Sequence, residues 1–468
     1  MSGFKPYPAY KDSGVEWLGK VPEHWALIPI KHLASLNPRK SDFQVGIQLL
    51  CSFVPMEKLK TGVLLLDEER QIKEVINGYT YFEDGDVLQA KVTPCFENKN
   101  IAIATGLTNG IGFGSSEINV LRPNHCVKAE YLYYRLQEDN YMDFCTSSMM
   151  GAGGLKRVPT NVINNFTIAA PGLAEQTQIA RFLDHETARI DALIEEQQRL
   201  IELLKEKRQA VISHAVTKGL DPTVPMKDSG VEWLGEVPAH WEVVRLGALY
   251  SEAADKGLPG LPVLQVSIHH GVSDKELTEE ESDRKITRIE DREKYKRVRT
   301  GDLVYNMMRA WQGGFGAVRV EGLVSPAYVV ARPEKNFEIS RYVEQLLRTD
   351  RAVEEMRRYS YGITDFRLRL YWDQFKNIRI ALPPEQERQE IMKRLALVTG
   401  EARVLEDEAA HLVSVLRERR SALISAAVTG KIDVRNWQPA TADKLVHEPM
   451  PMTAEEPACY KVSPEGMA

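Results

Sequence analysis

The sequence contains few residues whose types and spacing could support catalysis. His185-Glu186 resembles half of a HExxH zinc motif, but Arg occupies position 189, where the second histidine would stand. Thr429-Gly430-Lys431 lacks both the upstream glycine and the following Ser or Thr of a phosphate-binding loop. The pair His269-His270 has no carboxylate or cysteine at ligand spacing. We therefore expect no catalytic residues, no metal site and no cofactor in this chain.

Two stretches in each half of the chain have instead the composition of a nucleic-acid surface. Residues 91–100 and the glycine-rich loop 147–157 combine cations with polar side chains, which can reach phosphates and base edges. Residues 306–312 and 359–369 occupy the same places in the second half. Solvated loops with structural glycines have a similar composition, but the duplication favours recognition. The candidate DNA-binding residues are Lys91, Thr93, Asn98, Lys99, Lys156, Arg157, Asn306, Arg309, Gln312, Tyr361, Arg367 and Arg369.

A long helix is predicted over residues 175–217, a stretch without Pro or Gly that is rich in good helix formers. Pro171 and Gly172 precede this stretch, and Gly219 and Pro222 follow it, so both ends carry stop signals. A single amphipathic helix of this length needs a partner for its apolar face.

The partner is predicted over residues 387–429, because adding 212 to each number of the first helix gives its counterpart without a gap. Six identities between 210–217 and 422–429 fix this offset. Apolar residues recur on both helices with a period near 3.5, which is typical of a coiled-coil seam. Two ordinary core helices would be the alternative, but the matched length and charge pattern favour pairing. The predicted seam comprises Ile190, Leu193, Leu200, Leu204, Val211, Leu405, Leu412, Leu416 and Leu423.

A second internal repeat marks two equivalent halves. Residues 11–25 read KDSGVEWLGKVPEHW and residues 227–241 read KDSGVEWLGEVPAHW, with two differences. The four tryptophans of these copies could stack on bases. The interleaved Val, Leu and Pro favour the other interpretation, in which the tryptophans anchor each domain on its helix. These residues are Trp17, Trp25, Trp233 and Trp241.

The stretches between the repeats have a similar order of predicted elements and different sequences. Each has a strand after a Gly-Asp turn, a strand ending in Arg-Pro, a helix (129–140 or 339–358) and a short strand before Pro. This mixture predicts an α/β class: two pseudo-symmetric α/β domains separated by two long helices in an antiparallel coiled coil. The predicted segments are 1–25 (N-terminal repeat), 26–170 (first domain), 171–241 (helix and repeat), 242–382 (second domain), 383–432 (second helix) and 433–468 (disordered tail).

Composition limits the classes of protein that fit. The chain of 468 residues is 43% apolar and 27% charged, as in a globular protein with two or three domains. No apolar run approaches a membrane span and no secretory h-region is visible, so a cytoplasmic location is expected. The five cysteines form no CxxC pair, which argues against a zinc site. The net charge of −6 excludes a general polyanion binder but not a local DNA-binding face.

Taken together, these features resemble the specificity subunit of a type I restriction-modification system. The repeated KDSGVEWLG segments, VTPCFEN (92–98), NMMRAWQGGFGA (306–317) and the Pro/Glu/Gln openings of both helices carry the resemblance. It implies two target-recognition domains that each read half of a bipartite double-stranded DNA site. It also implies two methyltransferase (modification) subunits docked on the helices, and restriction subunits that complete the nuclease. S-adenosylmethionine, ATP and Mg²⁺ would then belong to those partners.

Three other interpretations remain open from the sequence. The chain could be an enzyme with an unrecognised site, a coiled-coil scaffold that binds no DNA, or the specificity subunit of a bipartite-site type II system. Because the two domains differ in sequence, a DNA reader of this kind should recognise an asymmetric target. The bases themselves cannot be derived, since loop geometry and DNA deformation determine them.

Overall fold

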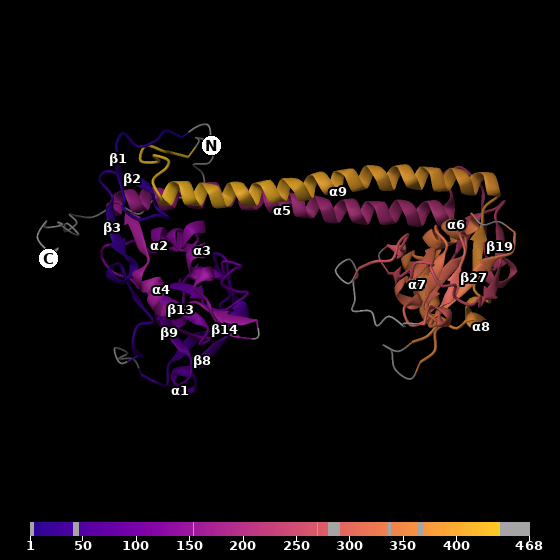
Figure 1. Ribbon diagram of the computed structural model, residues 1–468, viewed down its shortest axis with the longest axis horizontal. Helices are drawn as coiled ribbons and strands as arrows, with labels where there is room; N and C mark the ends of the chain where they lie inside the picture. Colours follow the sequence, from indigo (N-terminus) through magenta and orange to yellow (C-terminus); the bar gives the residue numbers. More distant parts are fainter. Residues whose placement is uncertain are drawn as a thin grey trace, which may run out of the picture. The chain divides into compact units, whose positions relative to one another are not determined.

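The computed structural model describes residues 4–40, 46–152, 154–268, 270–278, 291–335, 338–362 and 368–439. These residues form two compact units. Unit 1 contains Met1–Gln197 and His411–Ala468, and unit 2 contains Gln198–Ala410. Each unit therefore holds one α/β domain together with half of each long helix (Figure 1). Within the described ranges, no helix is long and apolar enough to cross a membrane.

The two long helices are α5, Leu173–Lys218, and α9, Glu385–Val428, within two residues of the predicted limits. Gly219 and Gly430 follow them with φ of 82° and 75°, a left-handed conformation that commonly ends helices. The helices pair as an antiparallel coiled coil. In unit 1 Arg420 Nε lies 2.8 Å from Asp191 Oδ1, and in unit 2 Arg208 Nη1 lies 2.9 Å from Glu406 Oε1.

The predicted seam of α5 is wrong at two positions. Leu193 and Leu200 are 46% and 42% exposed, whereas the following residues, Ile194 and Ile201, are half-buried. Buried or half-buried positions then recur at 183, 187, 190, 194, 197, 201 and 204, alternating steps of four and three residues. Two of these positions, Thr187 and Gln197, are polar, so the spacing of apolar residues does not reveal them.

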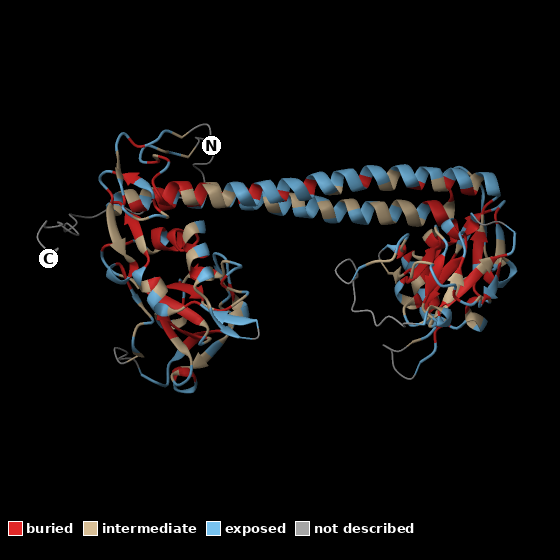
Figure 2. Ribbon diagram, viewed as in Figure 1, coloured by how far each residue is buried: buried red, intermediate tan, exposed pale blue. Residues whose placement is uncertain are grey.

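The seam of α9 needs the same correction. Leu405 and Leu412 are 49% and 42% exposed, and Ala409 and Val413 are buried instead. The predicted seam residues Ile190, Leu416 and Leu423 are buried, and Leu204 and Val211 are half-buried. Adjacent apolar residues made two registers possible, and the packing of the partner helix selects one of them. Exposed residues accordingly line the outer faces of both helices in Figure 2.

The domain of unit 1 is built on two four-stranded sheets. One sheet has the order β11-β10-β13-β4 and is antiparallel. The other has the order β8-β5-β12-β9, in which only β5 and β12 are parallel. The strands are β4 (Ala34–Leu36), β5 (Leu50–Val54), β8 (Glu69–Gln71), β9 (Thr80–Glu83), β10 (Val87–Ala90), β11 (Ile101–Ile103), β12 (Ile111–Gly114) and β13 (Ile118–Pro123), with α1 (Ile72–Val75) after β8.

Smaller strand pairs of unit 1 connect the domain to its surroundings. The repeat segment forms the hairpin β1-β2, and β3 pairs with β16 just before α5 begins. A hairpin, β14-β15, follows the helices of the domain. The bounds are β1 (Tyr10–Asp12), β2 (Lys20–Pro22), β3 (Ala26–Pro29), β6 (Leu59–Lys60), β7 (Val63–Leu64), β14 (Met150–Ala152), β15 (Leu155–Arg157), β16 (Thr167–Ala170) and α4 (Thr160–Asn165).

Unit 2 repeats the first of these sheets. Its antiparallel sheet β20-β27-β24-β25 matches β4-β13-β10-β11 strand by strand, and β19-β28 matches β3-β16. The bounds are β17 (Met226–Asp228), β18 (Glu236–Pro238), β19 (Glu242–Arg245), β20 (Tyr250–Ala253), β21 (Val266–Ser267), β22 (Gly271–Val272), β23 (Lys296–Val298), β24 (Leu303–Asn306), β25 (Phe315–Ala317), β26 (Gly322–Val324), β27 (Tyr328–Pro333), β28 (Arg379–Leu382) and α8 (Trp372–Phe375).

The single helix predicted in each domain is in fact two helices. Unit 1 has α2, Ala129–Arg135, and α3, Asp139–Ser147. Unit 2 has α6, Ile339–Leu347, and α7, Asp350–Arg358. The break in unit 1 lies at Glu138, whose extended backbone starts α3 while its carboxylate accepts hydrogen bonds from the amides of Asn140 and Tyr141. A capping side chain of this kind begins a new helix even where the apolar pattern continues.

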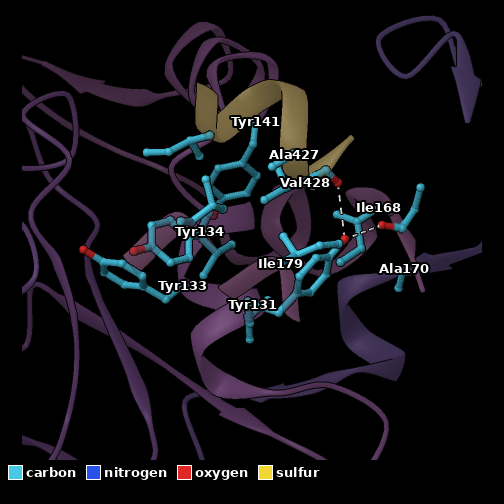
Figure 3. Packing of buried hydrophobic residues seen from close by; sticks show 14 of the residues in the cluster. Tyr131, Tyr133, Tyr134, Tyr141, Ile168, Ala170, Ile179, Ala427 and Val428 are labelled. Atoms are coloured by element: carbon cyan, nitrogen blue, oxygen red, sulfur yellow. Dashed lines mark hydrogen bonds between the residues drawn. The ribbon is translucent and has the colours of Figure 1, made fainter. Parts of the chain in front are cut away.

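A tyrosine on the first of these helices attaches each domain to the long helices. Tyr131 of α2 donates to the carbonyl oxygens of Ala169 (2.9 Å) and Val428 (3.3 Å), as Figure 3 shows for Val428. Tyr342 of α6 donates to the corresponding carbonyl oxygens of unit 2, those of Ala381 and Val216. Each domain therefore binds the last turn of the long helix that ends beside it.

The tryptophans of the repeat segments are anchors, as predicted. The buried indole of Trp25 donates to Glu175 Oε1 at the start of α5 (3.1 Å), and that of Trp241 donates to Glu387 Oε1 of α9 (3.1 Å). Trp17 and Trp233 belong to the same apolar clusters as their neighbours in each unit. Most of the predicted tail, residues 440–468, lies outside the described residues.

Candidate nucleic-acid interface

In unit 1 the two predicted basic loops are joined into one surface. Thr93 Oγ1 donates to the carbonyl oxygen of Gly154 (2.7 Å) and accepts from the amide of Lys156 (3.0 Å). The amide of Val158 donates to the carbonyl oxygen of Lys91 (3.0 Å). The segment after β10 therefore holds the β14-β15 hairpin, although about sixty residues separate the two in sequence. Thr93 has a structural role here that its loop position did not reveal.

The cations of this surface differ in their electrostatic state. Arg157 makes two hydrogen bonds to the carboxylate of Glu117, at 2.7 and 2.9 Å. This contact lowers the pKa of Glu117, because the guanidinium stabilises the ionised carboxylate. Lys156 is exposed on the same hairpin and makes no ion pair within the described ranges. Lys156 is therefore the cation most available to a phosphate, whereas DNA would have to compete with Glu117 for Arg157.

Two other candidates of unit 1 have different environments. The Lys99 ammonium binds the carbonyl oxygen of Gln137, the carboxylate of Asp139 (2.9 Å) and the hydroxyl of Ser421 on α9 (3.2 Å). These hydrogen bonds attach the domain to the helix, and the predicted DNA contact of Lys99 stays a prediction. Asn98 is exposed, and its backbone amide closes a turn onto the carbonyl oxygen of Pro94.

In unit 2 the segment after β24 is organised around a buried asparagine. Asn306 is 7% exposed, and its side-chain oxygen accepts from the amide of Met308 (3.0 Å). The amide group of Asn306 therefore stabilises the loop from within, and its predicted DNA contact stays a prediction. Arg309 is half-buried, Gln312 is exposed, and the indole of Trp311 donates to the carbonyl oxygen of Met308.

The second loop of unit 2 presents exposed side chains. Tyr361 is 62% exposed, and its backbone exchanges two hydrogen bonds of 2.9 Å with Arg369. Arg369 is also exposed and makes no ion pair with any residue that the structure describes. Arg367 lies outside the described residues, so its predicted role stays a prediction.

The two surfaces have the same backbone plan. The amide of Leu370 donates to the carbonyl oxygen of Met307 (2.9 Å), as Val158 donates to Lys91 in unit 1. The pair Tyr361–Arg369 likewise takes the place of the pair Met150–Arg157. Three of these four equivalent main-chain positions carry different side chains, and the fourth carries arginine in both units.

Sequence reasoning missed three residues of the unit 1 surface. Glu117 accepts hydrogen bonds from the Arg157 guanidinium. No local pattern indicates this contact, because forty residues separate the two. Met150 and Leu155 are 67% and 55% exposed on the hairpin, where apolar side chains could contact bases or thymine methyl groups. The sequence signal that could have indicated Met150 and Leu155 was the presence of apolar residues beside Gly and Lys in this loop. Across the described residues, no group of three or more His, Cys, Asp or Glu side chains could hold a metal ion.

Comparisons with known proteins show which proteins this chain is similar to. A sequence profile described as "Type I restriction modification DNA specificity domain" matches residues 79–204. The specificity subunit of the EcoEI type I restriction enzyme of Escherichia coli is 35% identical over 180 residues, which are 37% of this chain and 30% of that protein. The MjaVIII specificity subunit of Methanocaldococcus jannaschii is 24% identical over 89% of this chain and 95% of its own length. Residues 79–204 thus match a type I DNA specificity domain, and the MjaVIII alignment extends the similarity to a specificity subunit over most of the chain.

Two solved structures share the fold of this chain over most of its length. The HsdS subunit from Thermoanaerobacter tengcongensis aligns with a TM-score of 0.52 at 18% identity, covering 90% of this chain and all of that one. A chain from a study of type I system assembly aligns with a TM-score of 0.61 over 87% of this chain and 98% of its own length, also at 18% identity. At this identity the likeness concerns the fold. The alignment with the EcoEI subunit spans about a third of either protein, so its activity is not transferred by similarity alone.

Proposed function

We propose that this chain is the sequence-specific DNA-binding subunit of a type I restriction-modification complex. Each domain reads one half of a bipartite double-stranded site. The two half-sites differ, since the side chains of the two surfaces differ at equivalent backbone positions. Two linked readers gain affinity over one because the second binding event is intramolecular.

One observation supports this function most directly. The same interloop hydrogen bond, Val158 to Lys91 in unit 1 and Leu370 to Met307 in unit 2, holds loops of different sequence. Two domains that read different base sequences require the same backbone scaffold but different exposed cations and aromatic side chains. A coiled-coil scaffold without DNA binding would not need these paired surfaces.

The remaining parts of the proposal concern partners. The helix pair sets the separation of the half-sites and docks two modification subunits, and restriction subunits complete the nuclease. The chain itself catalyses no step: methyl transfer with S-adenosylmethionine belongs to the modification subunits, and ATP and Mg²⁺ to the restriction subunits. Its own residues position the DNA by contacting phosphates and base edges.

The test is the methylome of the host. We expect an adenine-methylated motif of two different short blocks around an unspecified spacer, which disappears when the gene for this chain is deleted. A methylome unchanged by the deletion would contradict DNA recognition. A bipartite motif whose methylation is accompanied by cleavage independent of ATP would instead favour the bipartite type II alternative.

A second experiment tests the spacing role of the helices. Inserting seven residues between Leu193 and Leu200, and seven between Leu405 and Leu412, keeps the coiled-coil register. Each helix then lengthens by about 10 Å. One base-pair step is about 3.4 Å, so the spacer should grow by at most about three base pairs while both half-sites stay the same. An active variant that methylates the original spacer would show that the helices do not set it.

A further inference from the structure

Unit 2 contains an open cavity of about 950 Å³ between α6 and the first half of α9. On the α6 side it is lined by Glu344 and Gln345, and on the α9 side by Ala396, Thr399 and Gly400. A side chain at Gly400 would meet no atom within 4 Å. The space is therefore accessible and large enough for one or two bulky side chains from another molecule.

The corresponding space of unit 1 is filled by tyrosines of the chain itself. Tyr131 and Tyr342 make the same two hydrogen bonds, so α2 and α6 align with Tyr133 at the place of Glu344 and Tyr134 at the place of Gln345. Tyr133 is 9% exposed and Tyr134 is 3% exposed. Figure 3 shows both rings within the apolar cluster of unit 1.

The filled site shows which groups hold an aromatic side chain. Tyr134 Oη donates to Asp184 Oδ1 (2.7 Å) and lies 3.3 Å from Thr187 Oγ1, both on α5. On α9 the same positions are Ala396 and Thr399. Unit 2 thus keeps the hydroxyl, loses the carboxylate and lacks both rings. An aromatic ring entering from outside would find Thr399 where Tyr134 finds Thr187.

The charged side chains of the cavity indicate which groups would flank an entering aromatic ring. Five cationic side chains and three carboxylates line the cavity, a surplus of two positive charges. One of these carboxylates, Glu344, is already occupied: it accepts from the amide of Ala317 (3.2 Å) and from Arg348 Nη1 (3.3 Å). Arg341 and Lys393 are exposed at the cavity. The buried Glu344 opposes a polyphosphate, whereas the exposed cations Arg341 and Lys393 suit the isolated carboxylates of a polypeptide.

We propose that this cavity is a docking site for a polypeptide segment of a modification subunit that carries an aromatic side chain flanked by carboxylates. The proposal rests on the proposed function, which supplies the partner. The ring occupies the space that Tyr133 and Tyr134 fill in unit 1, and the carboxylates pair with Arg341 and Lys393. Because unit 1 supplies its own rings, this contact exists only in unit 2, and the two modification subunits bind with unequal affinity.

The first test fills the cavity in the full chain. Ala396→Trp places a ring in the cavity, and Ala410→Trp is the matched control, an exposed alanine of α9 that does not line it. The purified modification subunit is titrated into each variant, and complexes with one and two modification subunits are counted by native mass spectrometry. We expect Ala396→Trp to weaken binding of one of the two modification subunits at least tenfold and Ala410→Trp to leave both unchanged. Unchanged binding by Ala396→Trp, or equal loss in both variants, overturns the proposal.

A second test identifies the occupant. Thr399→p-benzoylphenylalanine is irradiated in the assembled complex, and the attached peptide is sequenced by mass spectrometry. We expect a peptide of the modification subunit with an aromatic residue between acidic ones. An adduct to a nucleotide or to DNA only, or no adduct to the modification subunit, overturns the proposal.

The failure of this inference is distinguishable from failure of the proposed function. A wild-type complex that methylates a bipartite site keeps the proposed function, whatever Ala396→Trp does. A wild-type chain that binds no modification subunit overturns both. Charge reversal adds a graded measurement: Arg341→Glu with Lys393→Glu should weaken the same single site, and an unchanged affinity would remove the charge contribution.

Discussion

The two halves of the molecule agree in the contacts that anchor each domain to the helices and differ in their basic loops and in the space between α6 and α9. Glu175 accepts from Trp25 and lies 2.8 Å from His24, and Glu387 accepts from Trp241 and lies 2.7 Å from His240. The tyrosine contacts to the helix ends are equally matched. The basic loops and the α6–α9 cavity, in contrast, have different side chains in the two halves.

This difference shows which contacts the duplicated scaffold requires. A buried indole whose N–H is paired with a carboxylate fixes one orientation of the domain, since an unpaired polar group would be costly. Surface loops carry no such constraint and can change with the target. Four sets of variants test this division by comparing matched positions.

The largest effect is expected at the anchoring indoles. Trp25→Ala and Trp241→Ala should each lower the free energy of unfolding of their own unit by about 3–5 kcal/mol, because each empties a fully buried site. Hydrogen exchange followed by mass spectrometry would locate the loss. Equal deprotection of both units by either variant would show that the anchors do not act within their own halves.

The seam is the next test. Leu416→Asp should destabilise unit 1 by about 2–4 kcal/mol, because a buried leucine is lost and a charge enters an apolar seam. Leu204→Asp should act likewise on α5. The controls are the exposed neighbours, Leu412→Asp and Leu200→Asp, each expected within about 0.5 kcal/mol. Thermal melting of the four variants decides between the two registers, because the predicted register contains all four leucines. A loss of stability in Leu412→Asp and Leu200→Asp as large as in Leu416→Asp and Leu204→Asp would restore the predicted register.

DNA recognition should respond less strongly. Arg369→Ala is expected to cost about 1–3 kcal/mol in binding to the second half-site if the side chain contacts a base edge. Arg157→Ala, its counterpart, should have a smaller effect, because Glu117 already holds that guanidinium. Gel-shift titrations of the assembled complex on sites with one half-site altered separate the two. An unchanged affinity and site preference in Arg369→Ala would remove it from the contacts.

The smallest effect is expected at the tyrosine hydroxyls. Tyr342→Phe and Tyr131→Phe should each cost about 1 kcal/mol, since each leaves two buried carbonyl oxygens without this donor. Tyr361→Phe is the exposed control and should not change stability. Thermal melting measures all three. No loss in either buried variant would mean that other groups satisfy these carbonyls.

Much of the architecture is readable in the sequence. Neither long segment contains Pro, and α9 contains a single glycine, Gly400; with the stop signals outside, this composition predicts the limits of α5 and α9 to within two residues. The repeated KDSGVEWLG segments indicate two equivalent halves, and the spacing of apolar residues indicates pairing helices. These are local or periodic properties, and the sequence expresses them directly.

Only the tertiary structure decided the rest. Leu193 and Ile194 are both apolar, so the seam register depended on the partner helix and not on composition. In the sequence Arg157 has no neighbouring carboxylate, but the structure places Glu117, forty residues away, in contact with its guanidinium. Lys99 has a side chain suited to DNA contact, but its ammonium binds Asp139 and Ser421 instead. In each case the deciding neighbour is distant in sequence, and chain order does not encode which distant residues share a surface.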